Sequence, residues 1–460
     1  MTSRLPPRRR LFWRLAGALG IAFVVVGAGA GCGADNPSPP AQDSLGAKLA
    51  DAFRIDVSDI DVTYDFWPKA SRVEGSATLH FQMRPGQTRA LFDFNPLRQS
   101  NERERSMLTS LALDGEELDA YSNADLRRIR PSPGAEPAFE IQRRVSPGDE
   151  HTLHVTWSMP KPVPPRADDW FFANFDDTEG PKDETETMWP TISSPEDLIH
   201  HTIHLRIHSK TPYTVIGSGL VRRHQEDAVV QAWDVDTEKP VSSSTVFFAA
   251  VPSDQSRTDR FVASGVDVKI VSNRSPTTID RTQSIVRRTI ARLIRDFGPF
   301  PMPRVQILLT HWGSGMEYYG AVRTGIGSLE HELAHMYFGV TAVNRIWRDT
   351  WFDESVVVWW QAHAKLHPVG PGFRSGIGAG RPAAAPGFDE TAYGAGARVL
   401  QAIARALGGD RKMMEFLADL HARREFQPFT TEDFIHDVLA AQDTIDRKEL
   451  ERWLLSDRDR

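Results

Sequence analysis

Cysteine is nearly absent from this 460-residue chain, which contains only Cys32. A single cysteine excludes an internal disulfide framework, and it excludes metal sites built from several thiolates. Any metal that the chain binds must therefore be held by histidine and carboxylate groups. The sequence also lacks a glycine-rich phosphate-binding loop and any cluster of Lys and Arg interleaved with aromatic residues, so we expect no nucleic-acid partner.

Long apolar runs are scarce as well, and the most evident one covers residues 15–30 near the N-terminus. It is preceded by five arginines and followed by small residues and Cys32, an order typical of a secretory signal peptide. Residues 29–32, Gly-Ala-Gly-Cys, resemble a bacterial lipobox, in which the cysteine becomes the lipidated mature N-terminus. We therefore predict a lipoprotein signal peptide over residues 1–31 and a protein anchored by lipid to the membrane, outside the cytoplasm.

Alternatives remain open for this leader. The apolar run is short for a membrane span, which takes about 20 residues, yet an uncleaved anchor helix or plain secretion would also fit. Residues 9–12, Arg-Arg-Leu-Phe, resemble a twin-arginine export signal, although any basic leader explains them equally well.

Removal of the leader makes the chain more acidic. The leader holds five arginines and no acid, so its loss changes the formal net charge from −7 to −12. Such a charge disfavours binding to nucleic acid or, by charge, to an anionic lipid surface. The residues that follow, 32–50, are rich in Pro, Ser, Asn and Asp and cannot bury a core, which predicts a tether.

Alternating apolar and polar residues are frequent in the next segment, residues 51–262, for instance at 60–66, 153–157 and 203–207. Many short, half-buried strands predict an antiparallel, β-sandwich-like domain. The segment also contains a histidine cluster: His200, His201, His204 and His208. His204 and His208 share the outward face of a strand with Arg206, so we interpret the cluster as a solvated strand face and not as a metal site.

Helical spacing replaces this pattern in residues 263–460. Apolar residues from Ile285 to Phe297 mark one face of a helix that Gly298 and Pro299 terminate. A short apolar strand follows at residues 305–309, and most of the remainder is helical, apart from a surface loop at residues 368–387. The sequence thus predicts an α+β fold in which the β-domain precedes a mostly α-helical domain.

Residues 331–335, His-Glu-Leu-Ala-His, form the strongest chemical signal in the chain. Ser328 stands where an N-cap is expected, so the segment should be helical. A spacing of four then places His331 and His335 on one helix face, where both can bind one ion. Zinc suits imidazole and carboxylate ligands with one position open for water, and Glu332 lies within reach of that water.

Glu354 is the predicted third ligand. Eighteen residues separate it from His335, and it opens a second apolar helical run at residues 356–360. A second helix crossing the first would bring its carboxylate to the metal, so we predict one zinc ion per chain held by His331, His335 and Glu354. Its alternative role is an ordinary acid near the positive end of a helix dipole. Asp349 is predicted to accept a hydrogen bond from a ligand imidazole, or else to be a turn residue.

Taken together, these motifs resemble the aminopeptidase N family of zinc peptidases, which includes the leukotriene-epoxide hydrolase. The metal motif and its spacer match, and residues 314–318, Ser-Gly-Met-Glu-Tyr, are similar to the family's Gly-x-Met-Glu-Asn motif. Residues 347–354 resemble the family's approach to the third ligand, and residues 393–396, Tyr-Gly-Ala-Gly, its segment with the catalytic tyrosine. The likeness covers roughly residues 56–458 and implies a thermolysin-like catalytic domain.

The resemblance implies a role for each residue of the site. Glu332 would be the general base, and Tyr393 would donate a hydrogen bond to the oxyanion. Glu317 would pair with the free α-amino group of the substrate, with Gly315 and Met316 beside it in the substrate-binding segment. The implied enzyme is an aminopeptidase that removes N-terminal residues from peptides.

The chain departs from the family at several positions. Tyr318 replaces the asparagine of the amine motif, Val340 replaces a second asparagine, and Ala395 replaces a common lysine. Only thirteen residues separate Glu317 from His331. We also expect the short form of the family, without the helical C-terminal domain of its long members. These departures bear on the substrate range and leave the metal chemistry intact.

Two alternative functions stay open. A zinc endopeptidase of the thermolysin type would use the same metal motif, although its spacer to the third ligand is usually one residue longer. A catalytically inactive lipoprotein that binds peptides on the cell surface is the other alternative.

Overall fold

The computed structural model describes residues 54–455 with internal gaps at 71, 93–106, 120–121, 130–137, 160–170, 175–188, 193–195, 226, 228, 311–314, 346–348, 350, 371, 374–376 and 378–390. All described residues belong to one compact unit, Ser44–Arg460. Cys32, the predicted signal peptide and the predicted tether lie outside the described residues, as does most of the predicted loop at 368–387. Within the described part, no helix is long and apolar enough to cross a membrane. The domain boundary expected between residues 262 and 263 stays a prediction.

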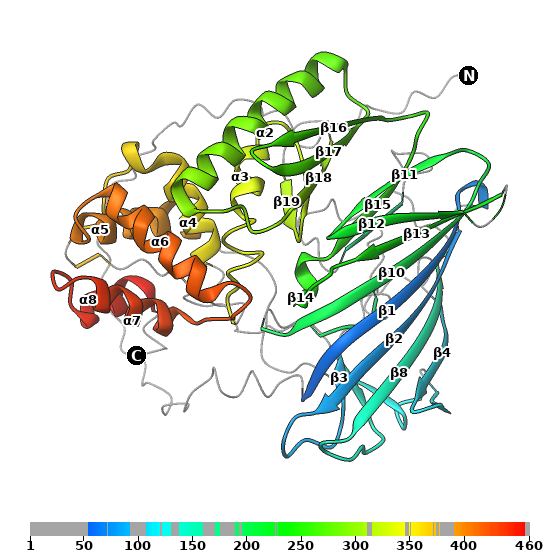
Figure 1. Cartoon of the computed structure of the whole chain (residues 1–460). Helices are drawn as coiled ribbons and strands as arrows, with labels where there is room; N and C mark the ends of the chain where they lie inside the picture. The colour runs from blue at the N-terminus through cyan, green and yellow to red at the C-terminus, as the bar shows by residue number, and fades with distance from the viewer. Residues whose placement is uncertain are drawn as a thin grey trace, which may run out of the picture. The chain divides into compact units, whose positions relative to one another are not determined.

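A large sheet makes up most of the N-terminal half (Figure 1). Its described strands run in the order β12 (Leu220–Gln225), β13 (Val230–Asp236), β10 (Leu198–His208), β1 (Ile55–Trp67), β2 (Arg72–Met83), β8 (Glu150–Met159), β4 (Met107–Leu113) and β5 (Glu116–Glu117), with β14 (Val241–Ser242) beside β10. Successive side chains point to opposite faces, and the apolar set of each strand, such as Val62, Tyr64 and Leu205, is fully buried. The predicted β-rich N-terminal domain is confirmed.

One pairing in the large sheet departs from the antiparallel pattern. Strands β1 and β10 run parallel, with Val62 opposite Ile203. The other pairings of this sheet, among the strands that the structure describes, are antiparallel. Strand direction could not be predicted from the sequence, because the alternation of apolar and polar residues is the same in both arrangements.

Smaller elements complete the β-rich half. One three-stranded sheet contains β11 (Tyr213–Gly217), β15 (Phe247–Pro252) and β9 (Phe171–Asn174), and another contains β3 (Leu91–Phe92), β7 (Ala138–Ile141) and β6 (Leu126–Ile129). Short 3₁₀ turns are η1 (Pro68–Ala70) and η3 (Ser243–Thr245).

The histidine cluster of β10 lies on both faces of the large sheet. His204 and His208 are half-buried on the outward face, where they pair with Asp234 (2.8 Å) and Asp65 (2.6 Å). His201 points to the opposite, buried face, and burial lowers its pKa to about 3. The structure therefore agrees with a strand face for His204 and His208, and it adds a neutral core histidine at position 201.

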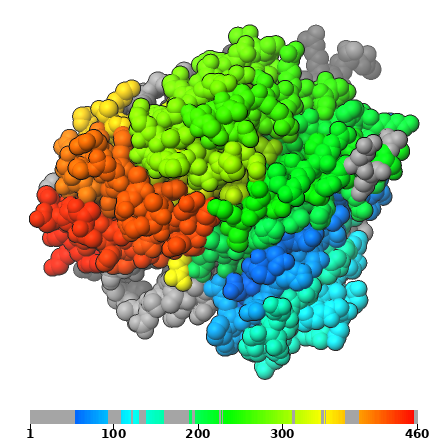
Figure 2. Space-filling view, viewed as in Figure 1, coloured from blue at the N-terminus to red at the C-terminus, as the bar shows by residue number. Residues whose placement is uncertain are grey.

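The C-terminal half combines a five-stranded sheet with helices. The sheet has the order β16 (Arg257–Ala263), β17 (Val266–Ser272), β18 (Arg304–Leu309), β20 (Ala321–Thr324) and β19 (Gly315–Tyr318), so β19 is an edge strand. The helices are α2 (Pro276–Phe297), α3 (Leu329–Ala334), α4 (Trp351–Ala362), η5 (His363–Lys365), η6 (Ala392–Gly396), α5 (Ala397–Ala406), α6 (Asp410–Arg424), α7 (Thr431–Ala441) and α8 (Arg447–Leu454). Figure 2 shows α6, in orange, packed directly against the green segment that contains α2.

The five-stranded sheet has two differently covered faces. Ile270 and Ile307 belong to the same core as the apolar side of α2, and α3 contacts β19 and β20. The neighbouring residues Val271 and Leu308 join a separate cluster that includes Phe247 of β15. Because successive strand residues point to opposite faces, helices α2 and α3 cover one face and the β-rich half covers the other.

Candidate metal centre

Helix α3 positions the two histidines of the metal motif. It spans Leu329–Ala334, and His335 is its C-cap residue, with His335 N donating to His331 O (3.3 Å). Ser328 occupies the N-cap position as predicted. Its hydroxyl, however, hydrogen-bonds Thr324 Oγ1 (2.8 Å), and its side chain accepts no helix N–H. The predicted helix is confirmed, and its start is held by the hydroxyl pair instead of a side-chain cap.

Glu354 reaches the two histidines from α4. Its Oε2 lies 3.0 Å from His331 Nε2 and 3.5 Å from His335 Nε2, and the two Nε2 atoms lie 3.1 Å apart. Each residue thus offers one atom within 4.8 Å of the others. The structure brings together all three residues that the sequence indicated as metal ligands.

The other nitrogen of each imidazole is held by an acceptor. His335 Nδ1–H donates to Phe338 O (3.0 Å), and His331 Nδ1–H donates to Gln361 Oε1 (3.2 Å). A proton on Nδ1 leaves the Nε2 lone pair available to a metal. Sequence reasoning missed Gln361, whose only signal is its place two turns after Glu354 on the same helix.

Asp349 contacts the start of helix α7. Its carboxylate accepts from Thr431 N (3.0 Å) and Thr431 Oγ1 (2.7 Å) at the start of α7. The same threonine hydroxyl accepts from Trp351 Nε1 (2.9 Å). Asp349 thus ties α7 to the start of α4, and the predicted hydrogen bond from a ligand imidazole to Asp349 stays a prediction.

Burial and charge act in opposite directions on Glu354. Burial alone would raise its pKa, but the charges of His335 and His331 and their hydrogen bonds outweigh burial and hold the pKa well below its ordinary value. Burial and the nearby charge of Glu354 raise the pKa of Asp353 well above its usual range. The site therefore concentrates negative charge on the one carboxylate that faces both imidazoles.

Two further carboxylates lie beside the histidines. Glu332 is 4% exposed, and its carboxylate lies with the carboxylate of Glu317 and the imidazole of His335 in a second group whose ligand atoms are within 4.8 Å of one another. Glu317 comes from the edge strand β19. Gly315, on the same strand, faces Glu332, and a Cβ at this position would lie 2.5 Å from Glu332 Cγ. The close approach of strand and helix thus requires a residue without a side chain.

Met316 turns away from this group. It lies between Gly315 and Glu317 in β19, and its side chain packs against the cluster that contains Phe247, on the opposite face of the sheet. Its backbone pairs with Arg323 of β20. The substrate-binding role predicted for Met316 is therefore compatible only with a main-chain contact.

Tyr393 approaches the centre from the π-helical turn η6. Its hydroxyl donates to Glu354 Oε1 (2.7 Å), and its ring stacks on His331 with 6.1 Å between ring centroids. Burial, followed by the charge of Glu354, raises its pKa well above the ordinary value, so the phenol remains a donor at neutral pH. Glu354 therefore presents one oxygen to Tyr393 and the other to the imidazoles.

The turn that carries Tyr393 packs closely against α4. Ser355 Oγ donates to Ala392 O (2.8 Å), and a Cβ at Gly396 would lie 2.8 Å from Ser355 Cβ. Contact at this distance leaves room for glycine only. The contact between Ser355 and Ala392 thus fixes the position of Tyr393 relative to Glu354, because each of these residues is adjacent in sequence to one of the two.

The donor set fits zinc. Two imidazole nitrogens with free lone pairs and one charged carboxylate oxygen converge, which is a ligand set typical of catalytic zinc sites. The facing Nε2 atoms, 3.1 Å apart, are both acceptors in the tautomers fixed by Phe338 and Gln361, so a cation between them would remove their mutual repulsion.

The fold has close counterparts among solved structures. An M1 zinc metallopeptidase from Deinococcus radiodurans superposes with a TM-score of 0.62 at 18% identity, over 87% of this chain and 94% of that one. A glutamate-to-alanine mutant of the Deinococcus enzyme bound to a Tyr-Ser-Ala substrate matches equally well, with a TM-score of 0.62 at 18% identity over 87% and 94% of the two chains. Aminopeptidase A from Legionella pneumophila, in complex with aspartic acid, gives a TM-score of 0.64 at 13% identity, over 87% of this chain and 49% of that one.

At these identities the likeness establishes the fold. The chain has the fold of M1 zinc metallopeptidases, in agreement with the resemblance carried by the sequence motifs. No protein-family model and no curated protein matches the sequence.

Proposed function

We propose that this protein is a zinc-dependent aminopeptidase. The observation that carries the proposal is the convergence of His331, His335 and Glu354 from two helices, with Glu332 beside them and outside the ligand set. The fold shared with M1 zinc metallopeptidases supports the same function.

Glu332 is assigned the general-base role. When bound, zinc would supply a Lewis acid that activates water and polarises the peptide carbonyl. Glu332, which is nearly buried beside His335, can accept the proton of the attacking water and return it to the leaving amine. Its burial keeps this carboxylate away from bulk water.

Tyr393 is assigned as the donor that stabilises developing negative charge on the substrate oxygen. Its phenol is protonated at neutral pH and lies next to Glu354, so a donor is present where that charge would form.

Glu317 is assigned the recognition of the substrate amine. A protonated α-amino group that leaves water needs a carboxylate partner, and Glu317 lies within 4.8 Å of Glu332 and His335 ligand atoms. An amine held there would limit cleavage to the first peptide bond. The Tyr-Ser-Ala substrate and the aspartic acid bound to the two structural neighbours are ligands with a free amino group, which is consistent with this assignment.

The test compares blocked and unblocked substrates. Purified protein should hydrolyse a fluorogenic amino-acid amide, lose this activity with a chelator, and leave N-acetylated peptides uncut. Glu317→Ala should keep its zinc and lose most activity on the unblocked substrate. Glu330→Ala is the matched control, because Glu330 lies on α3 and pairs with Arg292. Internal cleavage of N-acetylated peptides that is unaffected by Glu317→Ala would replace the aminopeptidase with an endopeptidase.

We also propose that Cys32 carries lipid and holds the protein outside the cytoplasm. The support is the small-residue sequence before Cys32 and the basic, then apolar, leader. Cys32→Ser should release the protein from the membrane fraction or leave it unprocessed. Unchanged mass and fractionation of that variant would instead favour an anchor helix.

A further inference from the structure

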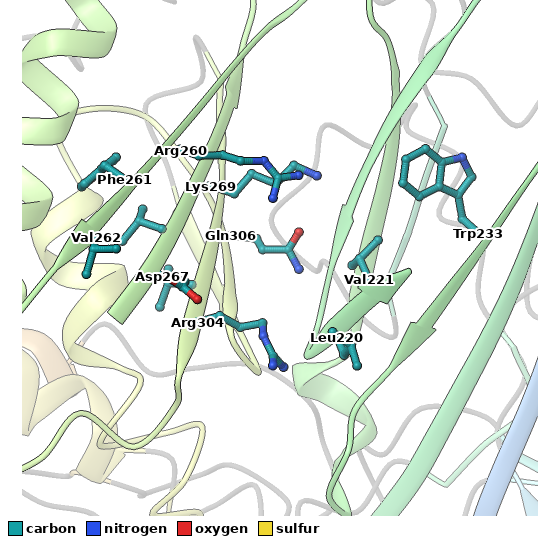
Figure 3. A pocket seen from close by; sticks show the side chains of 12 residues that line it. Leu220, Val221, Trp233, Arg260, Phe261, Val262, Asp267, Lys269, Arg304 and Gln306 are labelled. Carbon is teal, nitrogen blue, oxygen red and sulfur yellow. The ribbon is translucent and has the colours of Figure 1, made fainter. Parts of the chain in front are cut away.

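A second candidate site lies on the face of the five-stranded sheet opposite helices α2 and α3. A cavity of about 500 Å³ is lined by strands β12 and β13 of the large sheet and by β16, β17 and β18. Figure 3 shows side chains from both sheets pointing into the space between them. The volume lies within the range of about 300–1,000 Å³ typical of small-molecule sites.

Part of the lining of this cavity is apolar. It is formed by residues of three strands, namely Leu220 and Val221 of β12, Trp233 of β13 and Val262 of β16. Val262 is 54% exposed and is one of only two large apolar side chains that are exposed in the described part of the chain. Figure 3 shows Val262 and Trp233 on opposite sides of the cavity, with Val221 on the same side as Trp233. Val221 and Trp233 together offer a surface for an apolar chain.

The base of the cavity is a row of polar side chains across three strands. Arg260 of β16 lies directly opposite Lys269 of β17, and Lys269 lies opposite Gln306 of β18. Figure 3 shows the Arg260 and Lys269 side chains running alongside each other, with Gln306 next to them. Like charges in directly opposite positions of a sheet repel each other, so this arrangement is unfavourable without an anion.

Lys269 is left with unused donors. It is 9% exposed, and its ammonium group donates one hydrogen bond, to Val215 O (2.6 Å). An ammonium group has three N–H donors, so two remain without an acceptor among the residues that the structure describes. Burial, together with the charge of Arg260, lowers the pKa of Lys269 to about 8.

The neighbouring charges do not neutralise this pair. Arg304 also lines the cavity, but it pairs with Glu238. Asp267, the one acid of the lining, forms no ion pair with Arg260 or Lys269. Figure 3 shows Asp267 next to Arg304 and away from the cation pair.

We propose that this cavity binds a small amphipathic carboxylate, whose acid group lies between Arg260 and Lys269 and whose apolar part packs on Val221 and Trp233. The guanidinium group offers paired N–H donors that match a carboxylate, and the ammonium group adds its two unused donors. Carboxylates of this kind come from medium-chain fatty acids and from the C-termini of short apolar peptides. The site is independent of the zinc chemistry, because it lies on the other face of the sheet.

The test measures binding to the full-length protein by calorimetry. Decanoate and an N-acetylated apolar tripeptide acid represent the two sources of carboxylate, with decanol and the tripeptide amide as uncharged counterparts. At least one acid should bind with 1:1 stoichiometry and at least tenfold more tightly than its uncharged counterpart. The acid that binds identifies the source. Binding must persist after chelation of zinc, which separates this cavity from the metal centre.

Two variants locate the site. Arg260→Gln and Lys269→Met should each weaken the binding of the acid at least tenfold. Arg257→Gln is the matched control, because Arg257 lies on the same strand, is exposed and does not line the cavity. Hydrolysis of an amino-acid amide should be unchanged in all three, as a check of folding. The proposal is overturned if neither acid binds, if the uncharged counterparts bind as well, if binding needs zinc, or if Arg260→Gln has no more effect than Arg257→Gln.

Discussion

The two faces of the five-stranded sheet carry opposite charge. On the face toward α3, the carboxylates of Glu317, Glu332 and Glu354 gather around two imidazoles, and Glu354 has partners for both its oxygens. On the other face, Arg260 and Lys269 stand side by side with no acid between them. One face is suited to a metal ion and an amine, the other to an anion.

The alternation of side chains along a strand is enough to place different chemical groups on the two faces of the sheet. Met316 and Glu317 are consecutive in β19, yet their side chains lie on different faces, as do those of Lys269 and Ile270 in β17. A single strand can therefore present different side chains to the two faces of the sheet. The following predictions test whether substitutions on one face leave the properties of the other face unchanged.

The largest effect is expected at the third ligand. Glu354→Ala should abolish both bound zinc and activity, because two imidazoles alone are too few to close the site. Zinc is measured by atomic absorption alongside hydrolysis of an amino-acid amide. Glu330→Ala, on α3, should keep both. A Glu354→Ala protein with full zinc occupancy would contradict the ligand assignment.

Glu332→Ala should separate metal binding from turnover. Zinc should be retained, since Glu332 is outside the ligand set, while kcat falls about 10³-fold, as is typical for loss of a general base. The measurement is kcat at equal zinc content. A variant that kept wild-type kcat would move the general-base role to Glu317.

Tyr393→Phe should lower kcat about 10²-fold and leave KM nearly unchanged, as expected for a donor that acts on the transition state. Its hydroxyl also donates to Glu354, so zinc occupancy must be measured in the same samples. Equal losses in zinc and in kcat would show that Tyr393 acts only by holding the ligand.

Gln361→Ala should weaken zinc binding roughly tenfold, because His331 loses the acceptor of its Nδ1–H. At saturating zinc, kcat should be close to that of the wild type. Gln361→Glu keeps an acceptor and should restore the affinity. Competition with a zinc chelator of known affinity provides the measurement, and unchanged affinity in Gln361→Ala would make the contact incidental.

The smallest effect on activity is expected at Lys269. Lys269→Met should leave kcat and zinc content unchanged and should be more stable than the wild type at pH 7, because a buried charge is replaced by an apolar chain. The folded-state pKa of about 8 lies below the ordinary 10.5, so the unfolded chain binds more protons between these values. Wild-type stability therefore rises with pH in this window. The difference in free energy of unfolding between Lys269→Met and the wild type should narrow by about 3 kcal/mol between pH 7 and pH 10.5.

Urea unfolding of both proteins at the two pH values checks this prediction, since the other titrating groups cancel in the difference. A stability difference that stays constant with pH would show that the pKa of Lys269 is not lowered in the folded protein, because an acceptor or a negative charge stabilises its ammonium group. That result would contradict the contrast between the two faces.

The metal ligands could be predicted because their geometry is local. The spacing of four between His331 and His335 sets one helix face, and Glu354 opens the next helix, so few other arrangements were available. The hydrogen-bond partners of the ligand imidazoles were harder to predict from the sequence. Asp349 is closer in sequence to the motif than Gln361, but ring orientation and helix rotation decide which acceptor a given Nδ1–H meets, and neither follows from spacing.

The β-rich half shows the same limit. Alternation identified the strands and their buried residues, whereas the parallel pairing of β1 with β10 depends on how distant segments meet. The pairing of Arg260 with Lys269, on the sheet face opposite α2 and α3, could not be predicted from the sequence either. It depends on the register of β16 and β17, which sets the two residues opposite each other.

Gly315 has a consequence for how this sequence can change. Any larger residue there would push a carbon atom into Glu332, even though the electrostatic make-up of the site would stay the same. Even a single methyl group at position 315 would therefore force the Glu332 side chain to shift from its place beside His335. A substitution at this position would therefore obstruct the site sterically without removing an ionisable group.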